Sequence, residues 1–250
     1  MPEIIPFSTD LEAMEAELSW VEARIHRIQT QHRLHALIEG REVFMHHEKP
    51  LNRGTLERLL RKQTATETEL RQTIDARRAL SETALDQLCD SCGLTGDERS
   101  VLLLCAAPAF SKALESLVGS LDDPCHGRGF LSVEAVFNFL DFSMSERILA
   151  RAMFGKRGAL MENELIVLGL HDRYSEPEQL LSASLSLTSR TFTWLVGGAC
   201  SEDDMMDFSS LEEARASFDR VVLEPAARRR ILSVLDKHDL YLQHRKDWGV

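Results

Sequence analysis

The sequence predicts a mainly α-helical protein with a long N-terminal helical hairpin, or coiled coil, followed by a domain of short helices. In the first forty residues, apolar positions recur at spacings of three and four, which is the period of one helix face. Residues 80–110 contain two capped helices, the second apolar nearly all round. Two β-rich segments, 164–170 and 184–187, follow several short helices and predict a small β-hairpin. This order predicts a winged-helix-like domain after the helical hairpin.

The overall charge and apolar content exclude several classes of function. The 29 basic and 40 acidic residues give a net charge of -11, which argues against binding nucleic acid or anionic membranes. The longest apolar run, Val101–Phe110, is too short to span a membrane and contains a proline. The N-terminus lacks the features of a secretory signal, and five cysteines in such a chain favour reduced thiols. We therefore expect a cytoplasmic protein with no membrane partner.

Residues 1–79 predict two long helices. A capping pattern, Thr9 to Glu12, begins the first helix, and Gly40 ends it. Its apolar stripe resembles a coiled-coil seam and consists of Leu11, Met14, Leu18, Val21, Ile25 and Ile28. The second helix runs from about Thr55 towards Leu80, and its apolar side is patchy.

Two interpretations of this hairpin remain open. In the first, the two helices cover each other within one chain. In the second, the hairpin is a dimerising or docking coiled coil. The apolar positions of the second helix thin out between Leu60 and Leu70, so part of the first seam is expected to be open. It would receive a helix from a partner protein or from a second copy through its apolar residues, which are Leu18, Val21, Ile25 and Ile28.

Residues 80–198 form the predicted winged-helix-like domain. Gly93 ends a first helix, and a capping box from Thr95 to Glu98 opens the second, so the two form a helix-turn-helix unit. Further on, the predicted elements are helices at 111–119, 132–140 and 143–154, strands at 164–170 and 184–187, and a helix that begins at Thr188 or Ser189.

The C-terminal part has a different composition. Residues 199–217 are acidic and serine-rich and predict a linker. In residues 218–250, a strand is expected at 221–223 and a helix from Pro225. The basic cluster Arg228, Arg229 and Arg230 is either a solvated helix face or a contact with the acidic linker or a neighbouring subunit.

Three stretches of the chain, residues 88–124, 185–198 and 221–250, carry a family resemblance. They are similar to the N-terminal winged-helix region of bacterial AAA+ ATPases, of the kind associated with phage-tail-like contractile injection systems. The resemblance implies a regulatory, protein-interaction region that recruits a substrate or adaptor and couples it to the ATPase ring. It also implies that residues 218–250 lead into an AAA+ core.

The 250 residues themselves contain no nucleotide-binding motif. Phe154–Arg157 includes a Gly-Lys pair, but it lacks the second glycine and the following Ser or Thr of a phosphate loop, and no Walker B run is present. Phosphoryl transfer needs both a phosphate cradle and a magnesium ligand. We therefore expect no catalytic or cofactor-binding residue here, and ATP and Mg²⁺ only in a downstream core.

Cys89 and Cys92 have the spacing of a zinc knuckle, for which Cys105, Cys125 and His126 would be further ligands by residue type. However, both cysteines lie on the apolar face of a predicted helix, where free cysteine behaves as a small hydrophobe. We therefore predict no metal site.

The alternative function is an acidic winged-helix transcription regulator with a dimerising coiled coil. Its recognition-helix candidate, Ser132–Leu140, contains Glu134 and no basic residue, and residues 81–200 hold 9 basic against 16 acidic residues. Reading DNA bases requires polar or basic side chains and phosphate contacts. The sequence thus favours protein partners over nucleic acid.

Overall fold

A computed structural model describes residues 4–40, 52–121, 131–169, 180–198 and 224–237 of the chain. The chain divides into two compact units, residues 1–204 and 205–250. The second unit contributes one described helix, α10 (Pro225–Asp236). Among the described residues, no helix is both long enough and apolar enough to cross a membrane.

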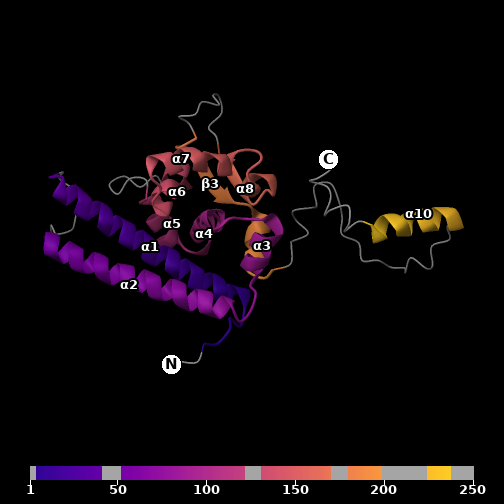
Figure 1. Cartoon of the computed structure of the whole chain (residues 1–250), viewed down its shortest axis with the longest axis horizontal. Helices are drawn as coiled ribbons and strands as arrows, with labels where there is room; N and C mark the ends of the chain where they lie inside the picture. The colour runs from indigo at the N-terminus through magenta and orange to yellow at the C-terminus, as the bar shows by residue number, and fades with distance from the viewer. Residues whose placement is uncertain (1–3, 41–51, 122–130, 170–179, 199–223, 238–250) are drawn as a thin grey trace. The chain divides into compact units, whose positions relative to one another are not determined.

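Helices α1 (Asp10–Ile38) and α2 (Arg53–Arg78) form the predicted hairpin and lie side by side (Figure 1). Thr9 caps α1 by accepting a hydrogen bond from the Glu12 N–H. The Glu12 carboxylate accepts hydrogen bonds from the N–H and the hydroxyl of Ser8, and not from the cap residue Thr9. The reciprocal contact of the expected capping box is therefore made one residue earlier, at Ser8. Asn52 caps α2, which begins two residues before the predicted start.

The remaining elements of the first unit follow the predicted order, with two additions that were not predicted, the strand β1 and the short helix α8. They are α3 (Ala84–Cys92), α4 (Gly96–Phe110), α5 (Lys112–Gly119), β1 (Leu131–Ser132), α6 (Val133–Leu140), α7 (Met144–Ala150), the 3₁₀ helix η1 (Arg151–Phe154), α8 (Ala159–Glu162), β2 (Ile166–Gly169), β3 (Ser184–Leu187) and α9 (Ser189–Leu195).

Local capping signals account for most of these boundaries. Gly93 ends α3 in the left-handed conformation at φ +62°, which a glycine adopts without a Cβ clash. The capping boxes that begin at Thr95 and Ser143 are both confirmed. A third box, between Thr83 and Asp86, opens α3 and was not predicted. At these helix ends, backbone groups left without a helical partner are satisfied by side chains or glycine conformations of the same local segment.

The strands form a three-stranded antiparallel sheet in the order β1-β3-β2. The predicted hairpin is confirmed, with Ile166 opposite Leu187 and Gly169 opposite Ser184. The third strand, β1, has only two residues and was not predicted, because so short a segment has no readable alternation. The sheet and the α6–α7 pair that follows β1 give the first unit a winged-helix architecture.

Helix α4 lies at the centre of the first unit and packs against α1, α5, α6, α8 and β3. Its residues from Val101 to Ala107 are all buried, as the apolar run predicts. Buried residues of α1 and α2, such as Ile25 and Ile74, belong to the same hydrophobic cluster as Leu103 and Phe137. The expected boundary at residues 79 and 80 therefore divides one continuous core. The division into two compact units falls after residue 204, inside the predicted linker.

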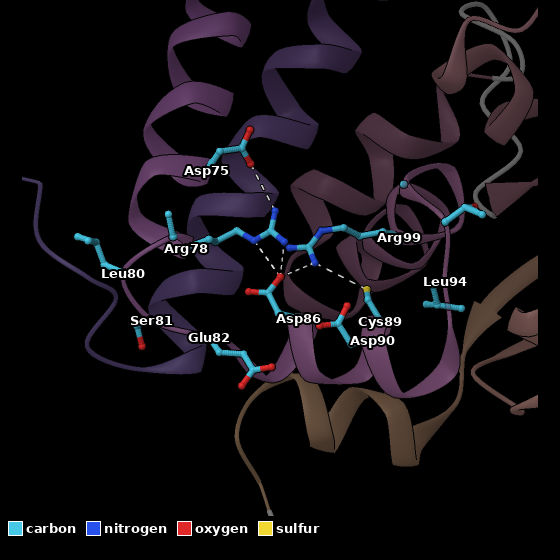
Figure 2. Close-up of a pocket in the computed structure, with 13 residues that line it drawn as sticks. Asp75, Arg78, Leu80, Ser81, Glu82, Asp86, Cys89, Asp90, Leu94 and Arg99 are labelled. Carbon is cyan, nitrogen blue, oxygen red and sulfur yellow. Dashed lines mark hydrogen bonds and ion pairs between the residues drawn. The ribbon is translucent and has the colours of Figure 1, made fainter. Parts of the chain in front are cut away.

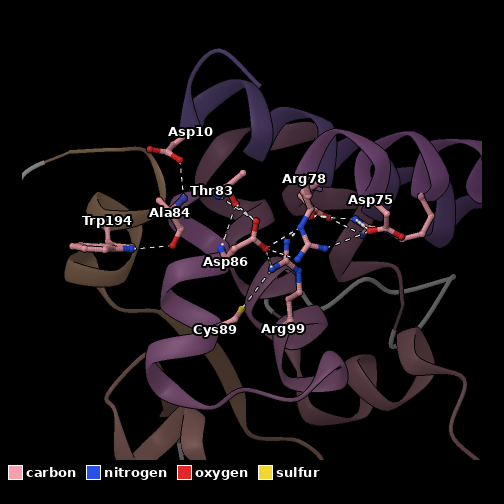
Figure 3. Close-up of polar contacts among 11 residues, drawn as sticks. Asp10, Asp75, Arg78, Thr83, Ala84, Asp86, Cys89, Arg99 and Trp194 are labelled. Carbon is pink, nitrogen blue, oxygen red and sulfur yellow. Dashed lines mark hydrogen bonds and ion pairs between the residues drawn. The ribbon is translucent and has the colours of Figure 1, made fainter. Parts of the chain in front are cut away.

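The start of α3 is tied to the N-terminal end of α1 and to α9 by polar contacts (Figure 3). Asp10 accepts a hydrogen bond from the Ala84 N–H at 2.7 Å, and the Trp194 indole donates to the Ala84 carbonyl at 3.0 Å. These contacts join residues that are far apart in the sequence and hold the hairpin against the winged-helix elements.

Candidate protein-docking surface

The four residues predicted to bind a partner lie in the core of the first unit. Leu18, Val21, Ile25 and Ile28 are 5%, 0%, 0% and 3% exposed. The expectation of an open seam is wrong for the folded chain, because α1 packs against α4, α5 and α6 as well as against α2. The apolar side of α2 is patchy, but the apolar seam of α1 is still covered, because the winged-helix elements pack against it.

The predicted basic cluster lies on α10, in the second unit. Arg229 and Arg230 are exposed, and Arg228 is half-buried. Ile231 and Leu232 on the same helix are also exposed. The contact of this cluster with the linker or with a neighbouring subunit stays a prediction.

The predicted recognition-helix candidate, Ser132–Leu140, corresponds to α6 and is mostly core. Val133, Ala135, Val136, Phe137 and Phe139 are buried. A three-residue connection at 141–143 leads from α6 into α7. These two helices form a helix-turn-helix pair besides the predicted pair of α3 and α4, and α7 is its second helix. The element in the recognition position is therefore α7 and not α6.

The basic residue of α7, Arg147, faces inward. Its guanidinium donates to the Phe142 carbonyl at 3.0 Å, to the Glu134 carboxylate at 2.6 Å and to the Asn138 side-chain oxygen at 2.8 Å. The guanidinium also lies 6.0 Å from the centre of the Phe137 ring. Arg147 thus anchors α7 to α6, and the charge of Glu134 neutralises it.

The opposite face of α7 is apolar and exposed. Met144, Ile148 and Leu149 are 76%, 62% and 76% exposed. With their exposed neighbours Ser145 and Ala152 they form the α7 surface. Three large apolar side chains together on one helix face are typical of an interaction site, whereas single exposed apolar residues are common on any protein. The sequence contains the spacing i, i+4, i+5, but this spacing is equally typical of a buried helix face.

A second feature of the first unit is an open groove between the end of α2, α3 and the start of α4 (Figure 2). Charged side chains form its floor, and Leu80 and Leu94 are among its apolar lining residues. Four of the charged groups that line it, Asp75, Arg78, Asp86 and Arg99, belong to a closed ring of ion pairs. We call it the ion-pair ring; in order, its members are Glu17, Arg71, Asp75, Arg78, Asp86 and Arg99.

The ion-pair ring joins four helices, and Figure 3 shows its part from Asp75 through Arg78 and Asp86 to Arg99. Glu17 of α1 is 2% exposed and accepts from Arg71 of α2 at 2.9 Å and from Arg99 of α4 at 2.7 Å. Asp86 of α3 accepts from Arg99 at 2.8 Å and also from Arg78. Each buried carboxylate therefore has two guanidinium partners, as a buried charge requires.

The ring shifts the pKa values of Asp86, Arg71 and Arg99. Burial by itself raises the pKa of Asp86, but hydrogen bonds from Arg78 and Thr83 and the charge of Arg99 outweigh burial and lower it to about 2. Burial lowers the pKa of Arg99, and the Glu17 carboxylate more than compensates, so the pKa is raised. Asp86 and Arg99 thus favour each other's charged form.

The groove offers little chemistry of its own. Cys89 accepts a weak hydrogen bond from Arg99 at 3.7 Å, and burial raises its pKa despite the nearby charge of Arg99. Its thiol stays protonated and is a poor nucleophile or metal ligand. Burial also raises the pKa of Cys105, to about 12. The described ranges hold no group of three or more metal-ligating side chains, and the candidate ligands Cys125 and His126 lie outside them.

Comparison with known proteins agrees with the architecture. A family model described as "winged helix domain, variant" matches residues 1–209. Searches of curated proteins and of solved structures found no match to this chain. The match covers both the helical hairpin and the winged-helix elements, which is consistent with their common core.

Proposed function

The chain belongs to the winged helix domain family in its variant form, and we propose that it acts as a protein-interaction module. The observation that carries this proposal is the α7 surface. The helix in the recognition position exposes Met144, Ile148 and Leu149, while its basic residue, Arg147, is paired with Glu134 on the inner side. An apolar helix face gains free energy by being covered by another protein surface.

A winged-helix architecture raises the question of nucleic-acid binding. The side chains of the α7 surface disfavour such a partner. Base readout uses donors and acceptors such as those of Arg, Lys, Asn and Gln, and affinity comes from cations near phosphates. The α7 surface carries none of these residue types, and the chain has a net charge of -11. No observation favours the transcription-regulator alternative over a protein-interaction module.

The finer proposal concerns the setting in which the module works. The resemblance of residues 88–124, 185–198 and 221–250 to the N-terminal regions of AAA+ ATPases supports a role in recruiting a substrate or adaptor to an ATPase ring. In such a role, the first unit would hold the recruited protein, and residues 205–250 would connect it to the motor. ATP and Mg²⁺ would then bind to the downstream core, in the assembly or remodelling of a contractile injection system.

The coding sequence downstream of residue 250 tests this setting. An in-frame phosphate loop, G-x-x-x-x-G-K-[ST], would support the motor role. An unrelated domain at that place would contradict the motor role without affecting the proposal that the α7 surface binds protein.

A titration with fluorescent DNA at low salt tests the choice between protein and nucleic acid. We expect both duplex and single-stranded probes to bind no more tightly than the non-specific level, for which dissociation constants are about 10⁻⁴–10⁻⁶ M. The matched variant is Ile148→Asp/Leu149→Asp, which should give the same result. Tight, sequence-discriminating binding by the natural chain that the variant loses would identify α7 as a nucleic-acid reader.

A further inference from the structure

A basic turn continues the α7 surface at its C-terminal end. Residues 155–158, Gly-Lys-Arg-Gly, follow η1 directly, and we call them the basic turn. The Gly155 N–H donates to the Ala152 carbonyl at 3.1 Å, and the Gly158 N–H donates to the Gly155 carbonyl at 2.8 Å. Since Ala152 is the last member of the α7 surface, the basic turn begins where that surface ends.

Close backbone packing holds the basic turn against η1. A Cβ atom at Gly158 would lie 2.3 Å from the Met153 carbonyl oxygen, so the turn approaches η1 as closely as a residue without a side chain allows. The side chains of Lys156 and Arg157, at the tip of the turn, are exposed. Both side chains are long and begin next to Ala152, so a molecule that covers the α7 surface would also reach these two cations.

The two cations of the basic turn are available to a partner. Within the described residues neither has an ion pair, and the nearest carboxylate along the chain, that of Glu162 on α8, pairs with neither. By contrast, Glu134 is paired with Arg147, and the Glu146 carboxylate accepts hydrogen bonds from the N–H and the hydroxyl of Ser143 at 2.7 and 2.6 Å. The unpaired charge at this end of the α7 surface is thus positive.

We propose that the α7 surface and the basic turn together bind an acidic amphipathic helix of another protein. This rests on the proposed function, since it requires the α7 surface to bind protein, and it states the chemistry of that protein. Apolar residues of the partner helix would cover Met144, Ile148 and Leu149. Carboxylates at one end of its apolar stripe would pair with Lys156 and Arg157.

Charge complementarity selects this partner over others. The exposed carboxylate of Asp141 lies before α7, at the opposite end, so the charge along the site changes sign and gives the partner helix one preferred direction. A phosphate backbone offers no apolar surface that could cover Ile148 and Leu149. The two cations of the basic turn are also fewer than the roughly four to eight with which proteins bind anionic lipids.

Two synthetic peptides test which charge the site selects. Both are stapled helices with the same stripe of leucines, and one ends in a run of glutamates and the other in a run of lysines. In anisotropy titrations with the full chain, the glutamate peptide should bind about tenfold more tightly than the lysine peptide. Non-specific attraction to a chain with a net charge of -11 predicts the reverse order, so the expected order would reflect the local cations.

Three variants locate the binding site of the peptides. Lys156→Glu/Arg157→Glu should lose the preference for glutamate, and Leu149→Asp should weaken the binding of both peptides. The matched control is Arg61→Glu/Lys62→Glu, which makes the same change in charge at two exposed positions of α2 and should keep the preference. Thermal melts establish that each variant is folded. If Lys156→Glu/Arg157→Glu does not fold, Lys156→Gln/Arg157→Gln takes its place.

The results separate this inference from the proposed function. The acidic helix would be overturned as partner by a lysine peptide that binds as tightly as the glutamate peptide, or by a glutamate peptide that does not bind at about 100 µM. A preference that survives Lys156→Glu/Arg157→Glu, or binding that Leu149→Asp leaves unchanged, would also overturn it. If both peptides bind equally and Leu149→Asp weakens both, the α7 surface binds protein and only this inference fails. A photo-cross-link from position 149 to a copy of this chain or to a lipid would likewise overturn the acidic helix.

Discussion

At the residue scale, the ion-pair ring explains how polar side chains are accommodated between the hairpin and the winged-helix elements. Glu17 is almost completely buried, and its two oxygens accept from Arg71 and Arg99. A buried pair of this kind contributes little net free energy when compared with apolar residues, but removing one partner is costly. The ring therefore sets the relative position of α1, α2, α3 and α4 more than it stabilises the fold.

The pKa of Asp86 predicts how stability depends on pH. Its folded pKa is about 2, below the ordinary value of 3.8, so its contribution is present above pH 4 and is lost as the pH falls from about 4 to about 2. Asp86→Asn should thus be less stable than the natural chain at pH 7, and the difference should shrink below pH 4. Urea unfolding at several pH values measures this.

The control for this prediction is Asp90→Asn, which replaces an exposed carboxylate of the same helix outside the ion-pair ring. We expect it to change the free energy of unfolding by less than about 0.5 kcal/mol. If the difference between Asp86→Asn and the natural chain stays constant down to pH 2, the pairing of Asp86 with Arg78 and Arg99 is not as described.

Distance along the chain decides which residue contacts could be predicted. The capping boxes at Thr95 and Ser143 join residues three apart, so the sequence reveals them. The ion-pair ring joins Glu17 to Arg99 across 82 positions, and any Arg and Glu of the chain would be equally plausible partners before the fold is known. The local boxes with Glu as the third helical residue were predictable, whereas the box with Asp86 in that place and the long-range ion pairs were not predicted.

At the scale of elements, α4 joins the hairpin to the rest of the first unit. The sequence predicts this helix from its capping box and its apolar run. The apolar stripe on α1 was also predicted, but the elements that pack against it, α4, α5 and α6, were not. The periodicity of a helix shows that one face must be buried, and it does not show by which element. For the same reason, the apolar face of α7 could not be recognised as exposed.

The common core predicts that one substitution in α4 unfolds the hairpin as well. Leu103 is 1% exposed, and Leu103→Asp would bury an unpaired carboxylate, which should destabilise the first unit by more than about 5 kcal/mol. Hydrogen exchange should then show that amides of α1 and α2 lose protection together with those of α4. Leu80→Asp, at an exposed position, is the control. Continued protection of α1 and α2 would show that the hairpin folds alone.

At the scale of the whole molecule, the sequence predicts the class of architecture well and the functional surface poorly. The helical hairpin, the two-stranded part of the sheet and the order of the helices are confirmed. The predicted docking residues on α1 are buried in the core. The prediction was wrong because a sequence gives the period of an apolar face and not its exposure to solvent. The family match over residues 1–209 agrees with a single unit that contains both parts.

The central claim is that the α7 surface is covered by protein when the chain is at work. A photo-cross-linking amino acid at position 149, in cells that express the full chain, tests this claim directly. The same amino acid at position 80, which is also exposed and apolar, is the control. We predict adducts at position 149 that protease removes and nuclease does not, and none of them at position 80. Nuclease-sensitive adducts at position 149, or no adduct there at all, would contradict the claim.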